Sequence, residues 1–451
     1  MKEEFVVLSP TAILGYGFPE ESFYRGLEKN PDLIAVDGGS TDPGPHYLGA
    51  GKSFTDRIGV KRDLRYMITE GVKRGIPVVV GTSGGCGAKP HLDWCREIVE
   101  EIAEENKLSF KLGLIYSDIE KEVVRRAFRD GKISSLDYVP ELTENIIDES
   151  INIVAQIGVE PMITALDQGC EVILAGRAYD PACFAALPIK RGYDEGLATH
   201  MGKILECAAI ASTPGSGSDC VLGILGEDYF RLETLSDERR FTKESTAAHT
   251  LYEKSDPYHL VGPGGSLNLE KCEFIEHEEK GVTVKGSVFE KAEKYTVKLE
   301  ASRMIGYRTI SIAGTRDSIL IGQIDSVIEK VKARVDDLLK KEKMEGKIHF
   351  HVYGKNGVMG SLEPETNLVS HEICIIIDVL APEQSMADTI CSMTRSTLLH
   401  YGYDGRISTA GNLAFPFSPS DIRAGEVYNF SLYHIMEIEN QELFKIEVKE
   451  I

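Results

Sequence analysis

Short apolar runs of strand length alternate with longer amphipathic stretches over the first half of the chain. Five of these runs end in polar or glycine-rich loops: Phe5–Leu8, Ile34–Val36, Ile76–Val80, Lys111–Ile115 and Val172–Ala175. Strands separated by helical patterns are typical of βαβ units, in which helices cover both faces of a parallel sheet. We therefore predict an α/β core with a doubly wound, mainly parallel sheet over residues 1–224. A (β/α) barrel is the alternative, because its loops also meet at the carboxyl end of the strands.

Two stretches between the fourth and fifth strands have weaker patterns. Residues 132–149 look irregular, with Thr143–Glu144 as a candidate helix cap. Ile151–Gln168 has the spacing of one amphipathic helix, which Gly169 would end.

From about residue 225 the pattern changes to alternating apolar and polar residues. Gly281–Gly286 and Tyr307–Ala313 are examples, and such alternation is typical of half-exposed antiparallel strands. We predict that residues 225–320 form an antiparallel extension that walls a pocket of the core.

A charged run, Lys340–Gly346, marks the predicted domain boundary. The core domain then covers residues 1–340, and a smaller α+β domain covers residues 345–451. In the smaller domain we expect strands at Ile348–Tyr353, Glu372–Leu380 and Val427–Ile438, and a helix at Gln384–His400.

Composition narrows the class of protein. The chain has 451 residues, more than one ordinary core accommodates. It carries 50 Lys and Arg against 71 Asp and Glu, a formal net charge of −21, which argues against nucleic-acid and anionic-membrane partners. We find no signal-peptide pattern and no run of about 20 apolar residues. The nine cysteines form no C-x-x-C pair, so we expect a reduced protein of the cytoplasm.

The glycine-rich turn after the third strand is the strongest candidate for a ligand site. Ser83, Gly84 and Gly85 precede a helix that starts near Pro90, and backbone N–H groups in such a turn can bind a carboxylate or phosphate. The alternative is a tight turn that needs glycine for its backbone angles. Neither a Walker A motif nor the dinucleotide pattern G-x-G-x-x-G is present, so we expect no ATP or NAD.

The loop after the second strand holds two carboxylates. Asp37 and Asp42 suit a hydroxylated substrate or a divalent metal ion, with His46 as a third ligand, and Ser40 between them is a candidate substrate contact. The alternative is that both aspartates cap turns.

Arg177 and Asp180 follow the fifth strand. An arginine there can bind a substrate carboxylate with two hydrogen bonds, or it can form a structural ion pair with Asp180 or Asp37. On the next predicted helix, His200 and Lys203 share a face with Cys207. With Asp37 they are the candidate proton-transfer residues, although a lone helical histidine is often structural.

Three further groups carry weaker signals. Ser216 and Ser218 offer hydrogen-bond donors in a second glycine loop, which can equally be a linker. His249 and Glu253 are four residues apart without the H-E-x-x-H pattern of zinc proteases. A cluster near the C-terminus either closes one rim of the site or makes a subunit contact, which we favour and which would make the protein a homo-oligomer; the cluster comprises Arg395, His400, Tyr401, Asn412 and Ser418.

Five sequence motifs resemble those of the acyclic terpene utilisation family, the AtuA-like proteins: Ser9–Gly17, Asp37–Pro45, Gly176–Pro181, His200–Cys207 and Pro214–Asp219. The resemblance spans nearly the whole chain and implies a ferredoxin-like C-terminal domain. It also implies a metabolic setting in which citronellol- and geraniol-type acids are degraded as CoA thioesters. It implies no catalytic residues.

These observations predict an enzyme that acts on a small carboxylic acid or acyl-CoA thioester by lyase or hydratase chemistry, in terpenoid or branched-chain acid degradation. Such chemistry needs acid–base groups and oxyanion donors but no redox cofactor. Two alternatives stay open: a non-catalytic subunit that binds an acyl ligand or acts as a scaffold, and a metal-dependent hydrolase or isomerase that uses Asp37, Asp42 and His46.

Overall fold

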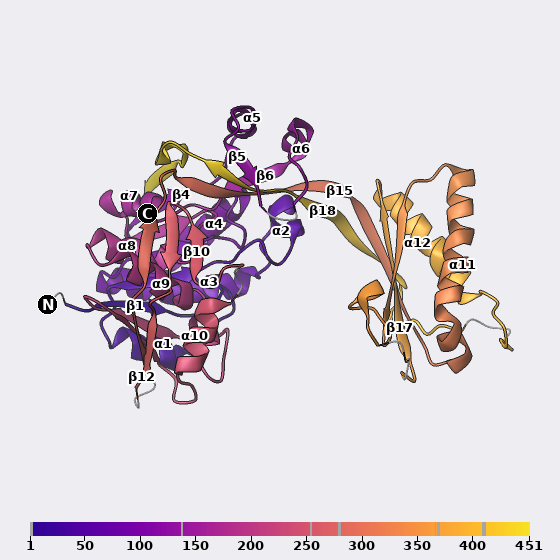
Figure 1. Cartoon of the computed structure of the whole chain (residues 1–451), viewed down its shortest axis with the longest axis horizontal. Coiled ribbons are helices and arrows are strands. Elements are labelled where there is room, and N and C mark those ends of the chain that lie inside the picture. Colours follow the sequence, from indigo (N-terminus) through magenta and orange to yellow (C-terminus); the bar gives the residue numbers. More distant parts are fainter. Residues whose placement is uncertain are drawn as a thin grey trace. The chain divides into compact units, whose positions relative to one another are not determined.

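The computed structural model (Figure 1) describes residues 3–136, 139–252, 255–277, 281–365, 367, 370–407 and 412–451. The chain divides into two compact units. Unit 1 comprises Met1–Arg303 with Phe430–Ile451, and unit 2 comprises Met304–Asn429.

Five parallel strands form the centre of a ten-stranded mixed sheet in unit 1. Across the sheet their order is β1 (Phe5–Ser9), β2 (Leu33–Asp37), β3 (Val78–Gly81), β7 (Val172–Ala175) and β4 (Lys111–Ile115). All five were predicted from their β-branched, apolar sequences. The α/β class is therefore confirmed.

Helices cover both faces of this sheet because successive strand residues point to opposite sides. Ile34 and Val80 pack with helices α1 (Glu20–Leu27), α3 (Arg57–Arg74) and α4 (Lys89–Asn106). Ala35 and Val79 pack on the other face, with the residues of α7 (Glu160–Asp167), α8 (Ala182–Lys190) and α9 (Glu195–Leu205).

The neighbouring strands β3 and β7 are followed by helices on opposite faces. After β3 the chain continues into α4, and after β7 it continues into α8. Loops that leave adjacent parallel strands in opposite directions open a crevice at the carboxyl edge of the sheet, where ligands bind in open α/β folds.

Antiparallel strands extend the sheet at both ends. Beyond β1 lie β8 (Val221–Leu225), β9 (Phe230–Thr234), β13 (Gly281–Lys285) and β12 (Glu273–Glu276), and β19 (Ile446–Glu450) pairs with β4. Over the described residues β12 and β19 are edge strands, so the sheet is open and the barrel alternative is wrong. A separate sheet contains β10 (His259–Gly262), β11 (Gly265–Asn268) and β14 (Val288–Lys291).

Unit 2 contains a four-stranded part of a second sheet. Along the chain the elements are β15 (Thr296–Thr315), α11 (Ser318–Glu342), β16 (Lys347–Tyr353), β17 (Ile373–Ala381), α12 (Gln384–Leu399) and β18 (Asp421–Glu437). The strand order is β16-β17-β15-β18. Apolar residues of both helices pack on β16 and β17 in one core. The division into units therefore does not fall at residues 340–345, where we expected a domain boundary, because Lys340–Glu342 are the last residues of α11. The chain passes between the units within two strands: β15 begins in unit 1, and β18 ends there.

The prediction of one helix at Ile151–Gln168 is wrong. The chain forms β6 (Ile151–Ala155), which pairs with β15, and then α7. The apolar residues at 151, 153 and 154 suit a strand as well as a helix, and Pro161 in the first turn of α7 favours a helix start there. The stretch before it, expected to be irregular, contains β5 (Ile133–Ser135) and α6 (Glu144–Glu149), which Thr143 caps as expected.

The remaining elements of the chain are α2 (Pro45–Ala50), α10 (Lys243–Leu251) and the 3-10 turns η1 (Ala208–Ala211), η2 (Gly360–Leu362) and η3 (Gln441–Leu443).

Candidate functional site

Loops from distant parts of the sequence meet at the carboxyl edge of the parallel strands. The N–H of Leu14 donates to the carbonyl of Asp37 (3.0 Å), and the N–H of Gly38 donates to that of Gly81 (2.7 Å). The N–H of Arg177 donates to the carbonyl of Gly87 (3.1 Å). The loop before β8 lies at the same edge of the sheet because β8 runs antiparallel to β1. In this loop the carbonyl of Gly217 accepts a hydrogen bond from the N–H of Ala12 (3.1 Å).

Arg177 lies in the loop after β7 and contacts Thr82, in the loop after β3. Its Nη1 donates to Asp180 Oδ1 (3.0 Å) and Thr82 Oγ1 (3.3 Å), and its Nε donates to Glu300 Oε2 (2.7 Å). The side chain is 3% exposed. Burial alone would lower the pKa of Arg177, but Glu300 and Asp180 outweigh it and raise the pKa well above its ordinary value. The structure thus gives Arg177 the ion-pair environment that we considered as the alternative to substrate binding.

Glu300, on β15, is the fully buried partner that the sequence did not reveal. Its second oxygen lies 2.7 Å from Lys298 Nζ. Burial would raise the pKa of this carboxyl, but Arg177 and Lys298 together lower it to about 2. Glu300 is therefore ionised at neutral pH.

Asp37, Asp180 and Glu206 form a group of three carboxyls beside Arg177, and we call it the carboxyl cluster. Asp37 is buried at the end of β2, and its Oδ1 has no hydrogen-bond partner. Burial, followed by Asp180 and Glu206, raises the pKa of Asp37 well above its ordinary value. Burial and the neighbouring Asp180 carboxyl likewise raise the pKa of Glu206, to about 8. Like charges this close do not all ionise, so the cluster retains a proton near neutral pH.

Lys203 supplies the cation of this cluster. Its Nζ lies 2.5 Å from Glu206 Oε1 and 4.5 Å from the centre of the Tyr252 ring. Burial would lower the pKa of Lys203, but Glu206 outweighs it and raises the pKa. Lys203 therefore stays charged. We call the carboxyl cluster together with Arg177, Lys203, Lys298 and Glu300 the polar hub.

The glycine-rich turn is tightly packed. Ser83, Gly84 and Gly85 are buried, and the N–H of Ser83 already donates to the carbonyl of Ala175 (2.9 Å). A Cβ on Gly84 would lie 2.5 Å from the carbonyl oxygen of His91. The glycines are thus required by packing, while Ser83 Oγ remains buried without a partner.

His200, on α9, is fully buried. Its Nδ1 is 2.7 Å from Ser287 Oγ, and its Nε2 is 3.0 Å from Thr250 Oγ1. The ring packs edge-on against Phe230. Burial, with a smaller effect of Lys203, lowers the pKa of His200 to about 3. Both nitrogens are occupied by hydroxyl groups, which gives the ring a structural environment.

The serine and metal candidates have the following positions. Ser218 is exposed, and its Oγ donates to the carbonyl of Tyr16 (3.3 Å), while Ser216 Oγ accepts from the N–H of Ser218 (3.2 Å). Ser40 Oγ donates to Asp42 Oδ2 (2.9 Å) in an exposed turn. Over the described residues, Asp37, Asp42 and His46 do not form a group at metal-ligand distances.

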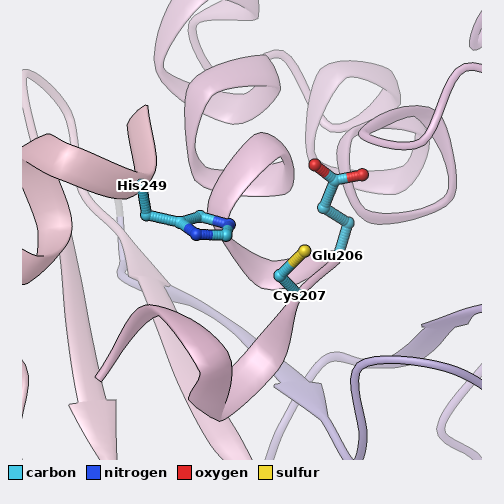
Figure 2. Close-up of side chains that lie close together, drawn as sticks. All are labelled: Glu206, Cys207 and His249. Atoms are coloured by element: carbon cyan, nitrogen blue, oxygen red, sulfur yellow. The ribbon is translucent and has the colours of Figure 1, made fainter. Parts of the chain in front are cut away.

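Three other residues do have their ligand atoms close enough together to bind one metal ion. The ligand atoms of Glu206, Cys207 and His249 all lie within 4.8 Å of one another, and Figure 2 shows the Cys207 sulfur between the His249 ring and the Glu206 carboxylate. Glu253, which we had paired with His249, lies outside the described residues.

A cavity of about 200 Å³ is lined in part by Tyr179 and Pro181, the two neighbours of Asp180 in the sequence. Its walls include Ala185 and Ile189 of α8 and Phe289 of β14, so residues of the antiparallel segment line this cavity together with residues of the core. Tyr179 Oη is buried there without a hydrogen-bond partner.

The family model described as "Acyclic terpene utilisation family protein AtuA" matches residues 57–217 and 236–415. The chain belongs to the acyclic terpene utilisation family. Membership in this family implies a role in acyclic terpene utilisation, and the matched residues include every member of the polar hub except Asp37. No curated protein and no solved structure matches the chain. Over the described residues, no helix is long and apolar enough to cross a lipid bilayer.

Proposed function

We propose that this member of the acyclic terpene utilisation family is a catabolic enzyme that moves protons on a small carboxylic acid or on the acyl part of a CoA thioester. The proposal is carried by one observation: the buried carboxyls of Asp37 and Glu206 and the half-buried carboxyl of Asp180 lie close together at the carboxyl edge of the sheet, with Lys203 paired to Glu206. Carboxyls held partly protonated near neutral pH are suited to general acid–base catalysis.

The proposed reaction is the addition or elimination of water. In the elimination direction, one carboxylate of the cluster takes the proton next to the acyl carbonyl. A protonated carboxyl of the cluster gives its proton to a hydroxyl group of the substrate. This hydroxyl group leaves as water while the carbon–carbon double bond of the product forms. Asp37 and Asp180 are the proposed proton-transfer residues, and Lys203 stabilises the negative charge that develops on the acyl oxygen.

The cavity supports a small acyl group as the substrate. At about 200 Å³ it is smaller than typical sites for drug-sized ligands, and Ala185, Ile189 and Phe289 give it apolar walls. It therefore suits a short branched chain, with the carboxylate or thioester end directed toward Tyr179 and the cluster.

The test is solvent-deuterium exchange followed by NMR, with geranic- and citronellic-type acids and their CoA thioesters. The intact protein is expected to exchange the proton next to the carbonyl, and Asp37→Asn is expected to slow this by about 100-fold or more. Asp42→Asn is the matched control, because Asp42 lies in the same loop but is exposed. Equal rates for the two variants, or no exchange with any substrate, would contradict the proposal.

A second candidate is a ligand-binding or scaffold subunit without catalysis. It is favoured by Arg177, whose hydrogen bonds go to Glu300, Asp180 and Thr82 within the chain. A large rise in melting temperature with an acyl ligand, without exchange or turnover, would select this function.

We also propose the two specific folds that the sequence suggested, a doubly wound core and a ferredoxin-like domain. Helices on both faces of the parallel strands support a doubly wound core for unit 1. The order β15-α11-β16-β17-α12-β18 supports a ferredoxin-like arrangement for unit 2.

A further inference from the structure

We propose that Glu206, Cys207 and His249 bind a divalent transition-metal ion, for which Zn²⁺ is the best match. The site differs from the one that the sequence suggested at Asp37, Asp42 and His46. One thiolate, one imidazole and one carboxylate are ligands that zinc accepts, and three protein ligands leave a fourth position for water or substrate.

The geometry places the three ligands on two elements of unit 1. Glu206 and Cys207 directly follow α9, and His249 lies on α10. The three ligand atoms lie within 4.8 Å of one another (Figure 2), so small side-chain movements bring them to one ion.

His249 provides a second, independent observation. Its side chain belongs to a residue that is 9% exposed, and its Nε2 has no hydrogen-bond partner. A buried polar atom normally has a partner, and a metal ion would supply one. The His249 ring packs against the Tyr252 ring, with centroids 4.7 Å apart and a tilt of 36° between the rings, and this contact restricts its orientation.

The charge of the surroundings can accommodate a cation. The polar hub contains four carboxyls, at Asp37, Asp180, Glu206 and Glu300, against three cationic side chains, at Arg177, Lys203 and Lys298. A divalent ion together with the Cys207 thiolate adds one positive charge, which takes the place of the proton that the carboxyl cluster otherwise retains. Lys203 is a repulsive neighbour, but its Nζ is paired with Glu206 Oε1.

Binding must release a proton from Cys207. Burial keeps this thiol protonated in the free protein, and its sulfur lies 3.7 Å from Tyr252 Oη. When the metal–sulfur bond forms, the thiol proton leaves to the solvent, as for other coordinating cysteines. No oxidant or reductant takes part.

This inference goes beyond the proposed function and does not depend on it. A metal at this position would lie beside Asp180 and Lys203, where it could polarise an acyl oxygen. Metal binding is measured without turnover, so its failure is distinguishable from failure of the acid–base proposal.

The experiment uses the full chain, stripped with a chelator and titrated with Co²⁺ as a spectroscopic substitute for Zn²⁺. We expect one ion per chain and a thiolate-to-cobalt charge-transfer band in the near ultraviolet. Cys207→Ser is expected to abolish the band and to weaken Co²⁺ binding by more than about 100-fold. His249→Gln is expected to weaken binding similarly while circular dichroism shows an intact fold.

Cys272→Ser is the matched control. Cys272 is also half-buried and lies 3.9 Å from a histidine nitrogen, that of His200, but it is not part of the trio. It is expected to leave the band unchanged. Absence of the band in the intact protein, or a band that survives Cys207→Ser, would overturn the proposal.

Discussion

The substitution Glu300→Gln gives a quantitative test of the polar hub. Glu300 is fully buried between Arg177 and Lys298, and the substitution keeps its size but removes its charge. The pKa of this carboxyl falls from 4.5 to about 2 in the folded protein. Because one pKa unit corresponds to about 1.4 kcal/mol, the charged form contributes about 3 kcal/mol to the free energy of unfolding. Removing one partner of a buried ion pair costs about 3–5 kcal/mol in other proteins, which agrees.

The sign of the pH dependence follows from this lowered pKa. The contribution of Glu300 is fully present above the unfolded pKa of about 4.5 and is lost as the pH falls toward 2. The difference between the intact protein and the variant should therefore shrink from about 3 kcal/mol near pH 7 to about 1.5 kcal/mol near pH 3.

Urea unfolding followed by tryptophan fluorescence measures this difference. The single tryptophan, Trp94, is half-buried in α4 and reports on unit 1, which contains Glu300. The exposed Glu273→Gln on β12 is the control, with an expected change within about 0.5 kcal/mol. A Glu300→Gln variant as stable as this control, or a difference that does not change with pH, would refute the ion-pair account.

Two further predictions concern the glycine-rich turn and His200. Gly87→Ala should lower the melting temperature of unit 1 by clearly more than Gly75→Ala. Both positions have positive φ (+70° and +68°), but only a Cβ at Gly87 would clash with a neighbour, the backbone nitrogen of Arg177 at 2.1 Å. Equal melting temperatures of the two variants would contradict the packing role of the turn. His200 should stay neutral in ¹⁵N NMR from about pH 7 down to about pH 4, since its pKa is lowered to about 3. Stability should accordingly fall as the pH drops below about 6.5, where the unfolded histidine takes up a proton, and titration of His200 near pH 6 would contradict this.

The convergence of Asp37, Thr82 and Arg177 was predictable from sequence because parallel strands place the loops at their carboxyl ends on one edge. The strands themselves were predictable from their β-branched runs. β6 was missed because its apolar spacing fits helix and strand equally well, and only pairing with β15 decides between them.

The partners of the site residues were not predictable. Glu300 lies 123 residues after Arg177 in the sequence, and the local pattern of β15 does not indicate that its carboxyl is buried. Sequence alone left substrate binding and an ion pair equally open for Arg177, and its contacts with Glu300 and Asp180 favour the ion pair. Likewise, Cys207 and His249 were each noted, but only the packing of α10 on α9 brings them together.

The most direct test of the central claim is infrared spectroscopy of the carboxyl groups near neutral pH. A protonated, buried carboxylic acid has a C=O stretching band that carboxylates lack, and the account predicts this band in the intact protein near pH 7. It should weaken or disappear in Asp37→Asn and persist in Asp42→Asn. Absence of the band, or a band unaffected by Asp37→Asn, would contradict a proton held by Asp37 at the carboxyl edge of the sheet.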